Sequence, residues 1–172
     1  MNIDDAHEGE TALIPTRRLR ITVNGVKRAV RIEDRQLLVD VLRETLGLTG
    51  PKVGCYNGDC GACTVMIDGT IAKSCLMLAA SVEGSVITTI EGVSAPGELD
   101  ELQKALWEND AFQCGFCISG HLFALRQLLE TNSDPTEQEI RKAVIGNLCR
   151  CTGYNNLVKA VLQIADRRRQ AA

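Results

Sequence analysis

The sequence predicts an α+β fold class, in which a unit of strands and one helix is followed by an all-α unit of four helices. In the first half, Leu19, Ile21 and Val23 alternate with polar residues, and this period of two is typical of a strand. In the second half, apolar residues recur at the three- and four-residue spacing of helices. The chain has 172 residues, of which 45% are apolar, and this length allows two small domains with packed cores.

The first half carries two hairpin signals. Asn24-Gly25 follows the first strand and favours a two-residue turn, because both positions of that turn need a positive φ. The partner strand is then expected near residues 30–32. Asp68-Gly69 separates two further short apolar runs and predicts a second hairpin of the same kind.

One helix and a closing strand complete the first half. Apolar residues return at helical spacing over residues 37–45, which predicts a helix there, and residues 85–90 have the composition of a strand. We therefore expect a flexible tail over residues 1–16 and a first domain over residues 17–92.

The pattern becomes helical after the closing strand. Residues 93–98 contain Ser, Pro and Gly and are expected to link the first domain to a helical domain over residues 99–172. Thr136 and Glu139 have the spacing of a capping box, so a helix is expected to begin at that point. The other helices are marked by Leu99, Leu102, Leu106 and Trp107, by residues 118–129 and by residues 156–168. Because short helices must bury their apolar stripes on one another, we expect a four-helix bundle.

Charge and hydropathy exclude several classes of protein. The net charge is −3 and the charged residues are mixed along the chain, which argues against a nucleic-acid-binding protein. No stretch reaches the ~18–20 apolar residues of a membrane span. The start of the chain is polar, and Arg17-Arg18 precede a strand pattern rather than an apolar export segment. A cytoplasmic location is therefore expected, and there the eight cysteines are better explained as metal ligands than as disulfides.

The first four cysteines have the spacing C-x4-C-x2-C with a fourth cysteine after eleven more residues: Cys55, Cys60, Cys63 and Cys75. This is the spacing of the ligands of a plant-type 2Fe–2S cluster. Gly54, Gly58 and Gly61 would let the loop curl tightly and bring backbone N–H groups toward the sulfurs, which stabilises an anionic cluster. A structural zinc site more often has two C-x2-C pairs, so the spacing favours iron and sulfur over zinc.

The second four cysteines combine C-x2-C with C-x-C: Cys114, Cys117, Cys149 and Cys151. The first pair would open one helix, and the second pair would lie between two others. All four could converge at one end of the bundle, where the N–H groups of a helix N-terminus favour negative charge. Spacing alone leaves both a 2Fe–2S cluster and a zinc site open for this set.

At these motifs the sequence resembles the small iron–sulfur subunit of the xanthine oxidase family of molybdenum hydroxylases. The matching stretches are GCYNGDCGACTV, QCGFC and GNLCRCTGY, in that order. The resemblance covers nearly all of residues 17–165. It implies a plant-ferredoxin-like β-grasp domain followed by a four-helix 2Fe–2S domain, and it favours the cluster over zinc in the second set.

The resemblance also implies a role and a set of partners. The chain would be an electron-transfer subunit of a molybdenum-dependent oxidoreductase with no substrate site of its own. Electrons would pass singly from a molybdopterin centre, in the cytosine dinucleotide form, on a large subunit to FAD on a medium subunit. The complex would be a dimer of heterotrimers. The C-terminal cysteines would hold the molybdenum-side cluster and the N-terminal cysteines the flavin-side cluster, with Gln113 and Cys149 in contact with the pterin.

The sequence departs from the family pattern just after Cys117. Thr-Pro-Gly is usual there, whereas this chain has Ile118-Ser119-Gly120, so we expect Ser119 to cap the helix in place of the proline. His121 follows on the same helix and is expected at the surface or an interface. Two other functions remain to be weighed: a stand-alone two-cluster ferredoxin, and a zinc-stapled interaction module.

Overall fold

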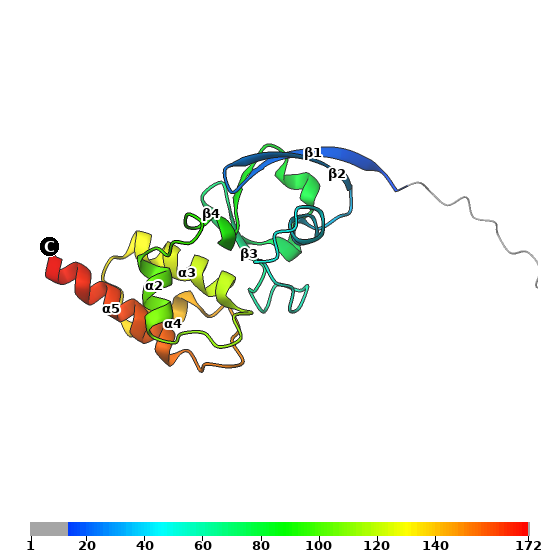
Figure 1. The fold of residues 1–172 in the computed structure, drawn as a ribbon. Coiled ribbons are helices and arrows are strands. Elements are labelled where there is room, and N and C mark those ends of the chain that lie inside the picture. Colours follow the sequence, from blue (N-terminus) through cyan, green and yellow to red (C-terminus); the bar gives the residue numbers. More distant parts are fainter. Residues whose placement is uncertain (1–13, 172) are drawn as a thin grey trace, which may run out of the picture.

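A mixed five-stranded sheet lies beside a group of four α-helices in the computed structural model, which describes residues 14–171 (Figure 1). The strands are β1 (Thr16–Val23), β2 (Val26–Glu33), β3 (Thr64–Ile67), β4 (Thr70–Lys73) and β5 (Val86–Thr88). Their order across the sheet is β2-β1-β5-β3-β4, and only the β1–β5 pair is parallel. The tail predicted over residues 1–16 falls largely outside the described residues, and its last residue already belongs to β1.

Both predicted hairpins are present. In the β1–β2 turn, Asn24 and Gly25 have φ values of 50° and 77°, and Val23 pairs with Val26 across the turn. In the β3–β4 turn, Asp68 and Gly69 have φ values of 48° and 82°. Positive φ at both turn positions is the geometry of a type I′ hairpin, so local sequence accounts for the register of each strand pair.

The predicted helix packs against the sheet, and its second half is a π-helix. It begins as α1 (Leu38–Asp40) and continues as η1 (Val41–Thr45), where the N–H of Leu46 donates to the carbonyl of Val41 at 3.0 Å. Leu38, Val41 and Leu42 share one buried cluster with the inward side chains of β1 and β5. Their i, i+3 and i+4 spacing places all three side chains on the face toward the sheet.

Three short 3-10 turns replace regular structure late in the first half. They are η2 (Ser74–Leu76), η3 (Ala79–Val82) and η4 (Ile90–Gly92). The closing strand predicted over residues 85–90 therefore ends at Thr88, and Ile90 already belongs to η4.

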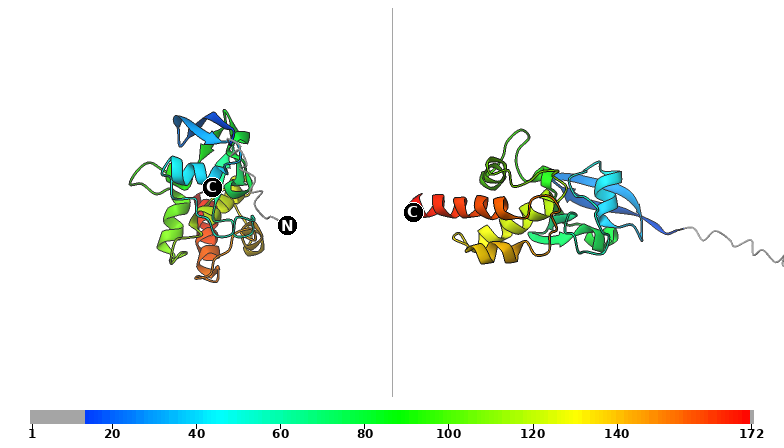
Figure 2. Two further views of the ribbon diagram at one scale, coloured as in Figure 1. Left: turned by 90° about the vertical axis from the view of Figure 1, so that its right-hand side faces the viewer. Right: turned by 90° about the horizontal axis from the view of Figure 1, so that it is seen from below.

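Four α-helices form the second half: α2 (Glu101–Glu108), α3 (Ile118–Thr131), α4 (Glu137–Ala143) and α5 (Asn155–Ala171). Leucine, isoleucine, valine and alanine side chains from all four share one buried cluster. In the right-hand view of Figure 2 the helical half extends from one end of the sheet half, and α5, the longest helix, points away from the sheet. Across residues 14–171, none of the helices has the length and apolar character needed to cross a bilayer.

Helix α2 differs from the prediction in two ways. Asp100 caps it and forms a capping box with Gln103, so the helix begins after Leu99. Leu99 is 52% exposed and Trp107 is 78% exposed, whereas Leu102 and Leu106 are buried. An eight-residue helix has room for only one buried stripe, and Trp107 follows Leu106 on the next face. The capping box predicted at Thr136 and Glu139 is confirmed as the start of α4.

Candidate metal centres

The N-terminal thiols lie at the open end of the β3–β4 hairpin, opposite its turn. Cys55, Cys60 and Cys63 are in the loop that joins η1 to β3, and Cys75 is in η2 just after β4. Cys63 and Cys75 are buried in one cluster with Val39 of α1, whereas Cys55 and Cys60 are half-buried. The β3–β4 hairpin thus carries Cys75 back to the loop that holds the other three thiols.

Backbone amides of this loop face the sulfurs, as the glycine content predicts. The N–H of Cys60 donates to Cys55 Sγ at 3.4 Å. This bond, with further N–H groups of the loop, lowers the pKa of the Cys55 thiol from 9.0 to about 7. Burial instead raises the pKa of the Cys75 thiol to about 12, and a metal cation bound at this sulfur would favour the thiolate form. Gly61, with a φ of 70°, allows the reversal of the chain between Cys60 and Cys63.

The C-terminal thiols converge at the start of α3. Cys117 is the N-cap residue of that helix, and Cys149 and Cys151 come from the loop between α4 and α5. Cys114 and Cys151 are exposed, and their Sγ atoms are 3.5 Å apart. These four residues line a pocket of about 510 Å³, and Cys60 of the N-terminal set contributes to the same wall.

The eight thiols contact one another in four pairs. The pairs are Cys55 with Cys60, Cys63 with Cys75, Cys114 with Cys151, and Cys117 with Cys149. Among residues 14–171, no three His, Cys, Asp or Glu side chains converge as the ligands of a single metal ion would. A 2Fe–2S cluster takes four thiolates, two on each iron, and pairs of thiols fit that requirement.

A direct backbone contact connects the two sets of thiols. The N–H of Leu148 donates to the carbonyl oxygen of Cys60 at 2.9 Å, and Leu148 is bonded to Cys149. One hydrogen bond and the intervening covalent bonds therefore join a thiol of one set to a thiol of the other. Ser119 strengthens the same junction, because its buried hydroxyl donates to the carbonyl of Thr64 at 2.8 Å.

Comparison with known proteins agrees with two cluster sites. Residues 21–87 match the family described as a 2Fe–2S iron–sulfur cluster binding domain, and residues 89–162 match the 2Fe–2S binding domain family. The nicotine 6-hydroxylase small subunit of Paenarthrobacter nicotinovorans is 49% identical over 142 residues, which are 83% of this chain and 86% of that protein. The chain belongs to the family of small iron–sulfur subunits of the molybdenum hydroxylases. It is thus an electron-transfer subunit of a molybdenum-dependent oxidoreductase.

Two further relatives show how this small subunit occurs. A chain of quinoline 2-oxidoreductase from Pseudomonas putida 86 superposes with a TM-score of 0.85 at 43% identity, and the match covers 90% of this chain and 97% of that one. The aldehyde oxidoreductase of Megalodesulfovibrio gigas is 47% identical over 148 residues, which are 84% of this chain but 16% of that protein. A stretch similar to most of this chain therefore also occurs within a much longer polypeptide.

Two sequence-based expectations about α3 are wrong. Ser119 does not cap the helix, since its hydroxyl bonds to Thr64 of β3, and α3 has no side-chain cap. His121 is 0% exposed rather than at the surface. Its Nδ1 lies 2.9 Å from the carbonyl oxygen of Cys117, and burial lowers the pKa of its imidazole. Helix α3 packs against β3 and β4 on one side and against α2 and α4 on the other, so its first turns have no exposed face.

Two residues of the GNLCRCTGY motif contribute in ways that spacing does not reveal. The hydroxyl of Tyr154 accepts a hydrogen bond from the N–H of Cys149 at 2.8 Å. Asn147 is buried, and its Oδ1 has no hydrogen-bond partner among the described residues. That oxygen lies against the backbone of Gly61 and Gly120, so it fills the junction between the cluster loop and α3. Their place inside a cysteine motif was the only signal in the sequence.

Gln113 lies at the edge of the C-terminal thiols. It is exposed and directly precedes the exposed Cys114. Cys149, the other predicted pterin contact, is half-buried, and its Sγ lies 3.1 Å from the hydroxyl of Thr152.

Proposed function

We propose that this chain conducts single electrons from a molybdopterin centre on a large subunit to FAD on a medium subunit, using one 2Fe–2S cluster at each cysteine quartet. Cys55, Cys60, Cys63 and Cys75 would hold the flavin-side cluster, and Cys114, Cys117, Cys149 and Cys151 the molybdenum-side cluster. The observation that carries this proposal is the 2.9 Å hydrogen bond from Leu148 N–H to the Cys60 carbonyl, since it joins the two quartets by one short path.

The exposure of the thiols supports this direction. Cys114 and Cys151 are exposed and line a pocket that is open to a partner, next to Gln113. Of the C-terminal thiols, only Cys117 is buried. A pterin contact at this surface is supported for Gln113, and among the thiols exposure favours Cys151 over the half-buried Cys149.

The remaining features of the complex follow from the family. We propose a molybdopterin cytosine dinucleotide on the large subunit, and a dimer of heterotrimers as the assembly. The relative from P. nicotinovorans is itself a small subunit of a hydroxylase, which supports the need for larger partners. A cytoplasmic location is proposed because all eight cysteines would have to stay reduced until the clusters are inserted.

We also propose that the two halves are separate domains, over residues 17–92 and 99–172, joined by residues 93–98. Each half has its own buried cluster, and α2 to α5 share one of them. This arrangement supports a β-grasp domain followed by a four-helix bundle.

The test removes the connecting hydrogen bond. Leu148→Pro deletes the N–H that reaches Cys60, and Leu148→Ala is the matched control because it keeps the N–H and removes only an exposed side chain. In the assembled enzyme, both variants should show two cluster signals by electron paramagnetic resonance. Electron transfer between the clusters should be at least tenfold slower in Leu148→Pro alone. Equal rates in the two variants would show that the path through Leu148 is not used.

The two other functions give different results in the same preparation. A zinc-stapled module would be colourless and free of iron, and would show no paramagnetic signal on reduction. A stand-alone ferredoxin would show both cluster signals but would purify without large and medium subunits. Co-purification with both subunits and reduction by the substrate of the large subunit supports the proposed function over either.

A further inference from the structure

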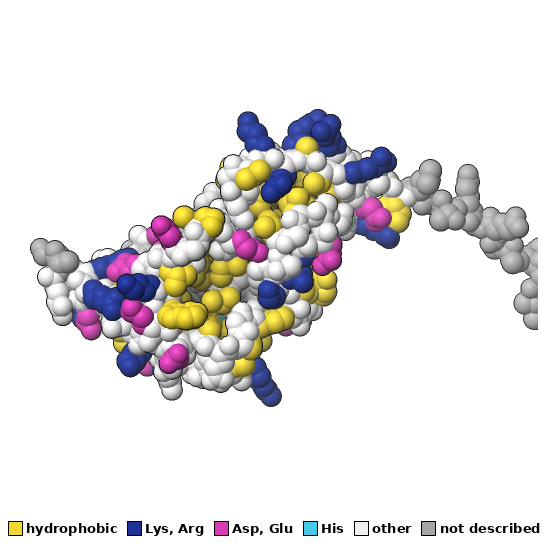
Figure 3. All heavy atoms as spheres, in the orientation of Figure 1, with side chains coloured by type: hydrophobic (Ala, Val, Ile, Leu, Met, Phe, Trp, Pro, Cys, Tyr) yellow, Lys and Arg dark blue, Asp and Glu magenta, His cyan; other side chains and the backbone are white. Residues whose placement is uncertain are grey.

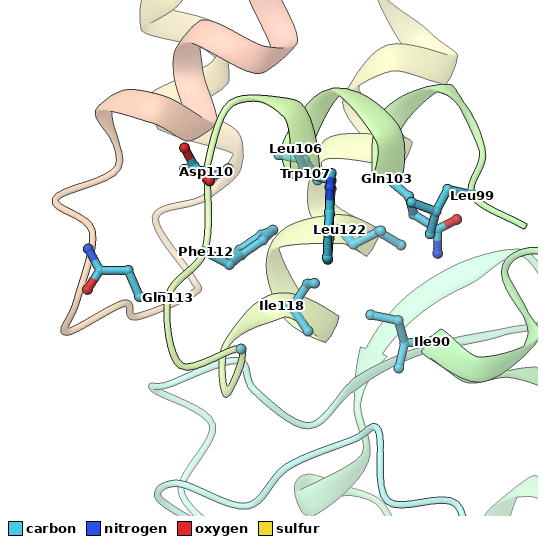
Figure 4. A pocket seen from close by; sticks show the side chains of 12 residues that line it. Ile90, Leu99, Gln103, Leu106, Trp107, Asp110, Phe112, Gln113, Ile118 and Leu122 are labelled. Carbon is cyan, nitrogen blue, oxygen red and sulfur yellow. The ribbon is translucent and has the colours of Figure 1, made fainter. Parts of the chain in front are cut away.

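An apolar groove runs along the helical half, beside the thiol pocket. It has a volume of about 430 Å³ and is lined by side chains of α2 and α3, by the segment between them, and by Ile90 of η4. Figure 3 shows hydrophobic side chains gathered in a hollow of this face. In Figure 4, Trp107 projects from α2 toward Ile118 and Ile90, and Gln113 lies at the other end of the groove.

Large apolar side chains at this groove are exposed to water, which is unfavourable in free energy. Trp107, the only tryptophan of the chain, is 78% exposed, and Leu99 on the same groove is 52% exposed. Large apolar side chains that are exposed next to one another are more typical of an interaction surface than of a surface that faces only solvent. Tryptophan is also among the residues that contribute most to binding at protein interfaces.

The groove is continuous with the surface at which the C-terminal thiols are exposed. Gln113 and Gly115 line the groove, and between them lies Cys114, which lines the thiol pocket. The pocket continues over Phe116 and Leu148, which are both exposed. None of the residues that line the groove comes from the loop or turn that carries the N-terminal thiols. A partner that approaches Cys114 would therefore cover the groove.

We propose that this groove is the docking site for an apolar segment of the large molybdopterin subunit, with Trp107 as its anchor. The proposal rests on the proposed function, because that function places the large subunit at the C-terminal thiols. The polar residues of the groove, Gln103, Asp110 and Gln113, would form the hydrogen-bonding rim of the interface. A segment with an apolar centre and a hydrogen-bond donor for Asp110 fits this lining.

The experiment measures how tightly the cluster-loaded chain binds the purified large subunit. The test variant is Trp107→Glu, which changes an exposed side chain and should leave the fold intact. The matched control is Val26→Glu, which places the same charge on a 49% exposed apolar residue of the β1–β2 hairpin. Loss of a central tryptophan contact should raise the Kd about 30-fold. The control should stay within about twofold.

Each outcome decides one question. A rise in Kd of tenfold or more in Trp107→Glu alone supports the groove as the docking site. A smaller rise overturns the docking proposal, provided that the wild-type chain binds the large subunit and is reduced by it. If Trp107→Glu instead loses the medium subunit and keeps the large one, the assignment of the occupant is wrong. If the wild-type chain carries both clusters but neither binds nor accepts electrons from the large subunit, the proposed function itself fails.

Discussion

Gly120→Ala tests the close packing at the junction between the cluster loop and α3. A Cβ atom at Gly120 would lie 2.2 Å from Asn147 Oδ1 and 2.3 Å from the carbonyl oxygen of Gly61. The Gly61 oxygen belongs to the backbone and cannot rotate away, so the junction must open by roughly 1 Å to reach an ordinary contact of 3.4 Å. Overpacking costs about 1–3 kcal/mol, and a clash with a backbone atom that cannot move away lies at the upper end of that range. The higher helix propensity of alanine offsets at most about 1 kcal/mol.

The net effect is therefore destabilising, by about 2 kcal/mol. For a chain of this length, that change lowers the Tm by about 4–8 °C. The assay is thermal unfolding of the cluster-loaded protein followed by circular dichroism. Gly146→Ala is the matched control in the same junction, because its Cβ would meet only the flexible end of Lys73, with Nζ at 3.5 Å and Cε at 4.0 Å. It should change stability by less than about 0.5 kcal/mol. If both variants melt within about 1 °C of each other, the junction is not close-packed and the reasoning is refuted.

Three further predictions concern single side chains. Tyr154→Phe removes the hydroxyl that accepts a hydrogen bond from Cys149 N–H. The paramagnetic signal and the reduction potential of the C-terminal cluster should therefore shift, while the N-terminal signal stays unchanged. Equal shifts in both clusters would contradict this prediction. In the iron-free chain, alkylation of Cys55 followed by mass spectrometry should rise about tenfold between pH 6 and pH 8, because its pKa is about 7, whereas a thiol with a pKa of 9.0 would gain about ninetyfold. Ser119→Ala leaves the Thr64 carbonyl without its buried donor and should cost about 1–3 kcal/mol in denaturant unfolding, and an unchanged midpoint would rule out that bond.

The elements of the fold were predictable where the signal is local. Asn24-Gly25 and Asp68-Gly69 determine two hairpins, because positive φ at both turn positions suits these residues and few others. The capping box at Thr136 was also predictable from a local signal, since its two partners are three residues apart. The π turn of η1 was not predictable, because the apolar spacing of residues 37–45 is that of an ordinary helix.

The burial of the side chains on α3 could not be predicted from the local sequence. An apolar residue at helical spacing has a predictable face only if one face of the helix is exposed. Residues 119–125 are buried all round, because α3 lies between the sheet and the other helices. His121 and Ser119 are therefore buried, although their residue types favour the surface.

The sequence alone determined the eight cysteines, their division into two quartets, and the hairpin and helices that carry them, because these depend on residues close together along the chain. The tertiary structure decided which thiols are buried and which are exposed. It also decided that Asn147 fills the space between Gly61 and Gly120, and that Leu148 reaches Cys60. The contacts of Asn147 with Gly61 and of Leu148 with Cys60 join residues more than eighty positions apart, and they exist only because the two halves pack against each other.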